Sequence, residues 1–343
     1  MKKGRGRRNK KKAVWIYITL CAGFFLMAAG GWAFLEMQRR EMAQERAEIQ
    51  KETDRLEEKA GQLSENRKAL EEQNQKAMKA EQKENQETGG KEKIIAEVSE
   101  PLELTEMEGK IQGMIADRTA AGEKWNVYVK KMSDGSFAKV GEEQLKAASL
   151  IKLYIMGAVY GQYDQLAAQY GAAQMDTLLA SMITVSDNDA ANELTRMLGA
   201  GDEAAGREQV NEYCQQKGYA GSSMGRMLLA DSSMGENYTT AADCAGFLFD
   251  IYQGRHPHAD QMLALLKQQQ RTGKIPAGVP EGTETANKTG ELADVENDAA
   301  IIWADGEPYI LCVMADQLTD TQAARDKIVA LSSEIYQQIQ GGE

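Results

Sequence analysis

Hydrophobic positions recur at two different spacings in the C-terminal two-thirds of the chain. Between residues 104 and 115 they recur every three or four residues, which predicts a helix over residues 102–120. Residues 125–132 alternate instead, and a Ser-Asp-Gly turn separates them from residues 137–140, so these two segments predict a β-hairpin. Further helical spacing covers residues 150–160, 174–183, 190–198 and 241–252.

A second hairpin and a final helix follow near the C-terminus. Residues 299–304 and 309–315 are apolar and flank a polar turn, and residues 321–339 return to helical spacing. Strands therefore lie at both ends of this region and helices fill its middle. We predict an α/β (α+β) domain over residues 97–343, in which an antiparallel sheet built from both ends of the domain is flanked by helices and carries a helical subdomain.

The N-terminal segment has the pattern of a membrane helix. Residues 1–12 form a basic tail, and residues 13–35 are a run of 23 residues without a charge. As a helix this run extends about 34 Å, enough to cross a bilayer core. A cleaved signal peptide is the alternative, because small residues lie at positions 28–31. We favour a transmembrane helix, because the run is longer than the roughly 7–15 residues of a signal core.

The basic tail also predicts topology. By the positive-inside rule the N-terminus lies in the cytoplasm, and the chain after Glu36 is extracytoplasmic. We therefore expect a single-pass protein of the cell membrane.

Residues 36–96 are predicted to form a helical stalk or linker. Glu, Gln, Lys, Arg, Asn and Ala dominate this segment, and Gly89-Gly90 lies close to its end. One heptad position is apolar throughout, with Met42, Ile49, Leu56, Leu63 and Leu70, but the second seam position is mostly polar. A weak coiled coil that forms a homodimer and a solvated single helix are both compatible with this pattern.

Charge excludes one large class of partners. Eight of the 40 Lys and Arg residues lie in residues 2–12, so the remainder of the chain has 32 basic against 52 acidic residues, a net charge of −20. Such a surface repels nucleic acid, and we predict no nucleic-acid partner.

Histidine and cysteine are too few, and wrongly spaced, for several common kinds of site. The two histidines, His256 and His258, share one loop-like run, which argues against a Ser-His-Asp hydrolase. Cys21 lies in the apolar run, and we expect Cys214, Cys244 and Cys312 to be buried thiols, with one disulfide left open. No spacing predicts a metal site, and we expect no cofactor.

Three short motifs carry the candidate chemistry. They are Ser149-Leu-Ile-Lys152, Ser186-Asp-Asn188 and Lys288-Thr-Gly290. Ser149 opens an apolar helical run, so Lys152 lies one turn later on the same face, within reach of the hydroxyl. Taken singly, each motif also fits an ordinary helix cap or turn, but three in this order are far less expected by chance.

A second match to the first motif, Ser136-Phe-Ala-Lys139, is a decoy. It lies in the predicted hairpin, where a residue three positions on faces the opposite side of the strand. Ser149 is therefore the better candidate nucleophile.

With these motifs the sequence resembles the serine hydrolases that include class A β-lactamases and penicillin-binding D,D-peptidases. The resemblance covers roughly residues 97–340 and extends to the segments 184–192, 238–243 and 297–302 around the motifs. It implies that an acyl-enzyme forms on Ser149 with β-lactams or related cell-wall amides.

The resemblance also implies a role for each motif residue. Ser149 is the nucleophile, Lys152 is its base, and Ser186 passes the proton to the leaving nitrogen. The backbone N–H groups of Ser149 and Glu291 form the oxyanion hole, and the expected substrate-binding residues are Asn188, Lys288, Thr289 and Gly290. Lys152 must be neutral to act as a base, and we expect burial and the charge of Lys288 to depress its pKa.

One element of the class A pattern is missing. Those enzymes carry a glutamate between the second and third motifs that activates the deacylating water. The matching residues 222–236 contain only Asp231 and Glu236 as carboxylates, and neither occurs in that pattern. Two alternatives to a β-lactamase therefore remain: a D,D-peptidase that acts on peptidoglycan stems, and a non-catalytic sensor that binds peptidoglycan or β-lactams without turnover.

Overall fold

The structure is a computed structural model that describes residues 104–341. The predicted basic tail, transmembrane helix and stalk, at residues 1–12, 13–35 and 36–96, lie outside these residues. Within residues 104–341 no helix is both long and apolar enough to cross a bilayer.

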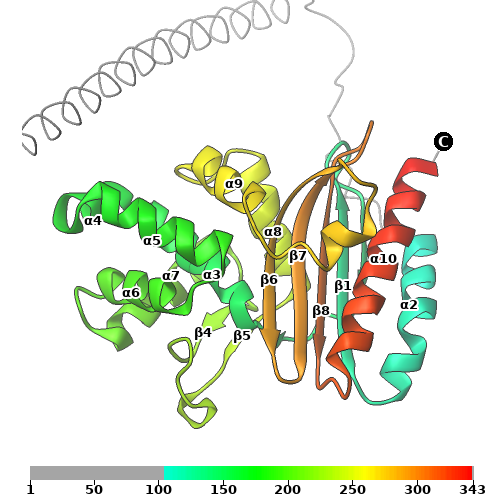
Figure 1. Cartoon of the computed structure of the whole chain (residues 1–343), viewed down its shortest axis with the longest axis horizontal. Coiled ribbons are helices and arrows are strands. Elements are labelled where there is room, and N and C mark those ends of the chain that lie inside the picture. The colour runs from blue at the N-terminus through cyan, green and yellow to red at the C-terminus, as the bar shows by residue number, and fades with distance from the viewer. Residues whose placement is uncertain (1–103, 342–343) are drawn as a thin grey trace, which may run out of the picture. The chain divides into compact units, whose positions relative to one another are not determined.

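A five-stranded antiparallel sheet built from both ends of the domain organises the fold (Figure 1). Its strand order is β2-β1-β8-β7-β6, so the N-terminal hairpin β1–β2 pairs with the C-terminal strand β8. The prediction of a sheet made from both chain ends, flanked by helices, is confirmed. The strands are β1 (Lys124–Lys131), β2 (Phe137–Val140), β6 (Glu284–Leu292), β7 (Val295–Trp303) and β8 (Tyr309–Asp316).

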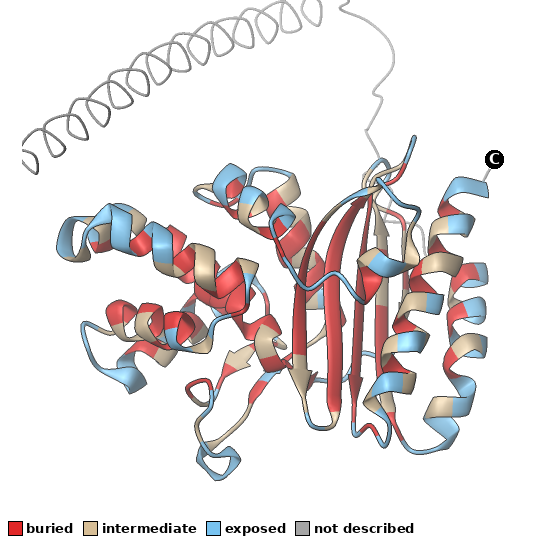
Figure 2. Cartoon of the chain, in the orientation of Figure 1, coloured by how far each residue is buried: buried red, intermediate tan, exposed pale blue. Residues whose placement is uncertain are grey.

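Side-chain alternation along β8 divides the hydrophobic core between the two faces of the sheet. Leu311 and Val313 contact the cluster under α2 (Thr105–Ala120) and α10 (Thr321–Gly341). Cys312 and Met314 belong to the other cluster, which continues into the helical subdomain. Every residue of β8 is buried because both faces are covered (Figure 2).

The helical subdomain fills the middle of the sequence, as predicted, and lies beside the edge strand β6 (Figure 1). A small three-stranded sheet, in the order β3-β5-β4, accompanies it. The predicted helices are confirmed, α8 with the predicted ends and the others with shifted ends, whereas α4, α7 and α9 are additions. The elements are β3 (Leu145–Lys146), α3 (Ile151–Gly161), α4 (Tyr163–Tyr170), α5 (Ala172–Thr184), α6 (Asn188–Leu198), α7 (Glu203–Lys217), β4 (Ser223–Met224), β5 (Asn237–Thr239), α8 (Ala241–Tyr252) and α9 (Ala259–Lys267).

The three cysteines in the described part of the chain are buried free thiols. The expectation of buried thiols is confirmed, and the disulfide that the sequence left open is not formed among Cys214, Cys244 and Cys312.

Candidate active site

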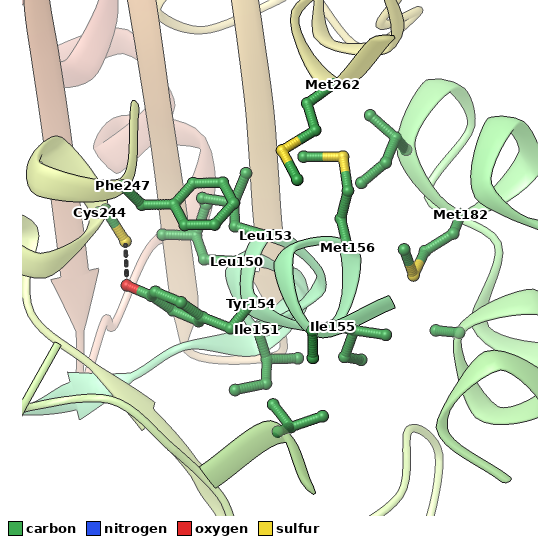
Figure 3. Close-up of a cluster of buried hydrophobic side chains, with 14 of the residues drawn as sticks. Leu150, Ile151, Leu153, Tyr154, Ile155, Met156, Met182, Cys244, Phe247 and Met262 are labelled. Atoms are coloured by element: carbon green, nitrogen blue, oxygen red, sulfur yellow. Dashed lines mark hydrogen bonds between the residues drawn. The ribbon is translucent and has the colours of Figure 1, made fainter. Parts of the chain in front are cut away.

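Helix α3 explains how a lysine comes to be buried next to a serine. Residues 151–160 are all buried, because other elements surround the helix on every side (Figure 3). Ser149 lies in the short 3-10 turn Ala148–Leu150 that leads into α3, and Lys152 is in the first turn of the helix. Lys152 is buried because the apolar residues on both sides of it in the sequence pack α3 into the protein interior.

The Lys152 amine connects two of the motifs. Its Nζ lies 3.2 Å from Ser149 Oγ and 3.1 Å from Ser186 Oγ. It also lies 2.6 Å from the Ser186 carbonyl oxygen and 2.7 Å from Asn188 Oδ1. Ser149 and Lys152 are thus within hydrogen-bond distance, as their helical spacing predicts.

The turn between α5 and α6 presents the second motif. Asp187 accepts a hydrogen bond from the Ala190 N–H at 2.7 Å and caps α6, so the capping explanation of this motif holds for its middle residue. Ser186 and Asn188, on either side of Asp187, contact Lys152 instead. One three-residue motif therefore both starts a helix and supplies two site residues.

The third motif lies on the edge strand β6. Lys288 Nζ donates to Ser186 Oγ at 2.9 Å and to the Thr289 carbonyl at 2.7 Å. A Cβ on Gly290 would come within 2.8 Å of the Ala147 carbonyl oxygen and 3.1 Å of the Ser149 nitrogen. The close approach expected at Gly290 is present, and it sets Glu291 of β6 next to the turn that holds Ser149.

The two lysines have strongly perturbed proton affinities. Burial is the main reason that the pKa of Lys152 falls to about 7; Asp187 raises this pKa, and the charge of Arg271 lowers it. The pKa of Lys288 falls well below its ordinary value through burial and the charge of Lys152. Burial lowers the pKa of Lys152 as predicted, and Arg271 adds a cation that the sequence did not suggest.

Backbone strain coincides with the two serines. Ser186 has a φ of 62°, and Ala148, immediately before Ser149, has a φ of 48°. Left-handed conformations of non-glycine residues cost on the order of 1 kcal/mol or more and persist where the surroundings fix them. Both serines are thus held by a backbone geometry that the rest of the fold imposes.

A cavity of about 130 Å³ opens beside Ser149. Asn188 and Glu291 line it, as do residues of the loop from Arg226 to Asn237. We refer to residues 226–237 as the wall loop. It contributes the apolar side chains of Leu228 and Leu229 to the cavity lining, together with the ion-paired Arg226 and Glu236.

The wall loop is fixed to the helical subdomain. The buried amide of Asn192, on α6, accepts from the Leu228 N–H at 2.8 Å and donates to the Leu228 carbonyl at 3.0 Å. Arg226 and Glu236 join the two ends of the loop through an ion pair of 3.1 Å. The position of Leu228 in the cavity wall is therefore specified by hydrogen bonds.

The two carboxylates of this stretch have different surroundings. Glu236 lines the cavity, but its oxygens bind Arg226 and the Asn237 N–H. Asp231 is exposed and caps a 3-10 turn by accepting from the Ser233 N–H at 2.8 Å. The position of Glu236 in the cavity lining could not be predicted from the sequence, because an ion pair across a loop leaves no periodic signal.

The decoy serine is engaged elsewhere. Ser136 Oγ donates to Asp134 Oδ1 at 2.6 Å in the β1–β2 turn, and Lys139 is ion-paired with Glu142. His256 is buried between Tyr213 and Tyr219, where burial lowers its pKa to about 4. The hydrogen-bond partners of Ser136 and His256 thus lie outside the three motifs.

The rest of the described chain offers a larger cavity and no metal site. A larger cavity, about 600 Å³, is lined by residues of α2 and α10, including Met107, Lys110 and Gln337, and holds no motif residue. Among residues 104–341 there is no group of three or more His, Cys, Asp or Glu side chains that could hold a metal ion.

Comparison with solved structures gives the same fold. PBP-A matches with a TM-score of 0.61 at 23% identity, over 70% of this chain and 98% of that chain. A β-lactamase from Sphaerobacter thermophilus matches with a TM-score of 0.59 at 23% identity, over 68% of this chain and 98% of that one. A β-lactamase from Xanthomonas campestris matches with a TM-score of 0.58 at 19% identity, again over 68% and 98%. A search of curated proteins finds no match.

A family comparison accounts for the same region of the sequence. The model of the β-lactamase enzyme family matches residues 165–339, just over half of the chain, and this range contains the second and third motifs. The first motif precedes it and meets the other two in space through Lys152 and Ser186. The chain belongs to the β-lactamase enzyme family.

Proposed function

We propose that this protein is a serine hydrolase in which β-lactams or related cell-wall amides acylate Ser149. The observation that carries the proposal is the Lys152 amine, buried, 3.2 Å from Ser149 Oγ and with a pKa of about 7. A buried lysine of this kind is neutral in much of the population at neutral pH, so it can take the proton of a serine hydroxyl.

The acylation step uses the three motifs in turn. Ser149 Oγ attacks the substrate carbonyl carbon and transfers its proton to Lys152 Nζ, which leaves negative charge on the carbonyl oxygen. The backbone N–H groups of Ser149 and Glu291 are the proposed donors to this oxygen. When the C–N bond breaks, the proton on Lys152 passes to Ser186 Oγ, and Ser186 gives its own proton to the leaving nitrogen. The first transfer follows the 3.1 Å contact between Lys152 Nζ and Ser186 Oγ.

Substrate orientation is assigned to the remaining motif residues. Lys288 and Thr289 hold a substrate carboxylate, Gly290 leaves room for close approach to β6, and Asn188 binds the side-chain amide. A carboxylate next to Lys288 would favour its protonated form. Repulsion from that charge would then keep Lys152 neutral, as a base must be.

The test is intact-mass spectrometry of the full-length protein in detergent after exposure to penicillin G. We expect the mass to increase by one penicilloyl group, and Ser149→Ala to lose this adduct. Ser136→Ala is the matched control, since Ser136 is the other serine that precedes a lysine by three positions. Absence of an adduct on the folded wild type would overturn the proposal.

A long-lived acyl-enzyme is the form of this function that the wall loop favours. Leu228 and Leu229 face the cavity beside Ser149, and the nearby carboxylate of Glu236 is held by Arg226. PBP-A, which shares the fold, has a mutant that was solved as an acyl-enzyme complex with penicillin G. Release of D-alanine from a stem-peptide mimic, measured beside nitrocefin hydrolysis, distinguishes a D,D-peptidase from a β-lactamase. Stable labelling without either turnover would indicate a penicillin-binding sensor.

Localisation is part of the proposal. We expect residues 13–35 to anchor the protein in the cell membrane with residues 97–343 outside the cytoplasm. A membrane-impermeant fluorescent penicillin added to intact cells should label the full-length protein, and labelling only after lysis would contradict this topology. Crosslinking through a cysteine placed at Leu56 would test whether the stalk pairs into a homodimer.

A further inference from the structure

Glu291 lies between two cavities. It follows the Lys288-Thr-Gly290 motif on β6 and lines the 130 Å³ cavity beside Ser149. It also lines a second cavity of about 290 Å³, together with Thr289 and Arg271. Whatever binds along this end of β6 therefore meets the Glu291 side chain.

Three cations surround the Glu291 carboxylate. Arg271 Nη1 lies 3.1 Å from it, and Lys274 Nζ lies 3.2 Å away. Arg325, on α10, lies at 3.9 Å. These charges lower the pKa of Glu291, so it is an anion at neutral pH.

Two of these cations have a second acidic partner, and the third, Arg271, is paired with Glu291. Lys274 and Arg325 are also paired with Glu296, which is 1% exposed and approaches them to 2.6 Å and 2.8 Å. Within residues 104–341, Glu291 is the acid that pairs with Arg271, and half of the Arg271 side chain is exposed. The Arg271–Glu291 pair is thus the part of the cluster that an incoming ligand can open.

Arg271 acts on the site chemistry at a distance. Its charge contributes to lowering the pKa of both Lys152 and Lys288. Glu291 partly neutralises this charge, so the pair sets how positive the surroundings of Thr289 are to an approaching substrate.

We propose that Glu291 is a displaceable internal counter-ion, whose carboxylate occupies Arg271 in the free enzyme and gives way to an anionic group of the substrate beside Thr289. This rests on the proposed function, because it concerns the charge preference of that same site. Glu291 thereby restrains the preference for anionic substrates: an incoming carboxylate gains Arg271 only by replacing an existing ion pair.

The main test compares penicillin G with its methyl ester as acylating agents. E291Q keeps the backbone N–H and removes the charge, so we expect the acid-to-ester ratio of acylation rate constants to increase about 5- to 10-fold. R271Q should lower that ratio, and E291Q should change it less than about 2-fold in the R271Q background. E284Q, at the other end of β6 where Glu284 pairs with Lys267, controls for net charge and should leave the ratio unchanged. An unchanged ratio in E291Q, or an equal increase with and without Arg271, would overturn the proposal.

A second test does not depend on acylation. E291A vacates the carboxylate position, so acetate at constant ionic strength should raise its melting temperature by about 1–2 °C relative to chloride. The E291A/R271Q double variant should show no such difference. If acetate fails to stabilise E291A, the counter-ion role is wrong even where penicillin labels Ser149. If acetate stabilises E291A but no β-lactam labels the wild type, it is the proposed function that fails.

Discussion

Two parts of the Ser149 site differ in chemistry: the motif cluster, which is Lys152, Ser186 and Lys288, and the wall loop. The motif cluster forms a continuous set of hydrogen bonds between 2.6 and 3.2 Å. The wall loop presents Leu228 and Leu229, although Asn192 fixes its backbone with two hydrogen bonds.

This difference separates the two half-reactions of a serine hydrolase. Acylation needs a base for the hydroxyl and a proton for the leaving nitrogen, and the motif cluster has groups for both. Deacylation needs a base for water, and the wall loop places apolar side chains next to Ser149. Under the proposed function, we expect such a site to form an acyl-enzyme faster than it releases one.

Loss of the base should have the largest effect. Lys152→Met keeps a long apolar stem but removes the amine, so we expect the second-order rate constant of acylation to fall by about 10³-fold. Stopped-flow measurement with a fluorescent penicillin gives this constant. Lys139→Met is the matched control, because Lys139 follows the decoy Ser136 by three residues and pairs with Glu142. A decrease of less than tenfold would mean that another group deprotonates Ser149.

A carboxylate on the wall loop should abolish the contrast. Leu228 is 9% exposed and lines the Ser149 cavity, so Leu228→Glu sets a general base beside the acyl group. We expect release of the penicilloyl group to accelerate by about 10²-fold, measured as the loss of label over time.

Two variants control for the Leu228 experiment. Leu228→Gln has a similar shape but cannot accept a proton, so it should not accelerate release. Glu236→Gln tests the carboxylate already in the wall, and we expect little change because Arg226 holds it. Acceleration by Leu228→Gln would mean that a polar side chain is enough and no added base is needed. Loss of residual release in Glu236→Gln would show that the wall loop already activates water.

The pH dependence of acylation should report Lys152. Only the neutral amine accepts the serine proton, and burial lowers the pKa of this amine to about 7. The rate should therefore increase about tenfold per pH unit well below pH 7 and level off above it. Arg271→Gln should move the midpoint upward, since the Arg271 charge lowers this pKa. A flat profile between pH 5 and 8 would contradict a lysine base.

The motif cluster could be predicted from the sequence, whereas the position of the wall loop could not. Ser149 and Lys152 share a helix face, and Gly290 marks the close approach of β6, so local spacing carried that information. Leu228 and Glu236 enter the cavity through contacts with Asn192 and Arg226, which are distant in sequence or lie across a loop.

Strand β6 could not be predicted from the hydrophobic pattern either. Asn287, Lys288 and Thr289 are buried yet polar, so the strand has no apolar alternation to find. These side chains are buried because the edge of the sheet meets the helical subdomain, where Ser186 supplies a hydrogen-bond partner for Lys288. Polar side chains that are buried by tertiary contacts leave no hydrophobic periodicity, so a strand of this kind cannot be predicted from that pattern.

The smallest predicted effect concerns the backbone of the wall loop. Leu229 has a φ of 65° and is 74% exposed, so its side chain gains little from packing while its backbone is strained. Leu229→Gly removes the strain at the expense of a more flexible unfolded chain, and we expect a net gain of about 0.5–1 kcal/mol in the free energy of unfolding. Leu229→Ala keeps the Cβ and is the matched control in urea denaturation. A glycine variant more stable than the alanine variant means that the fold forces an apolar side chain to the mouth of the cavity against local preference. The reverse order would mean that the left-handed turn is unstrained, and the apolar wall would then rest on Leu228 alone.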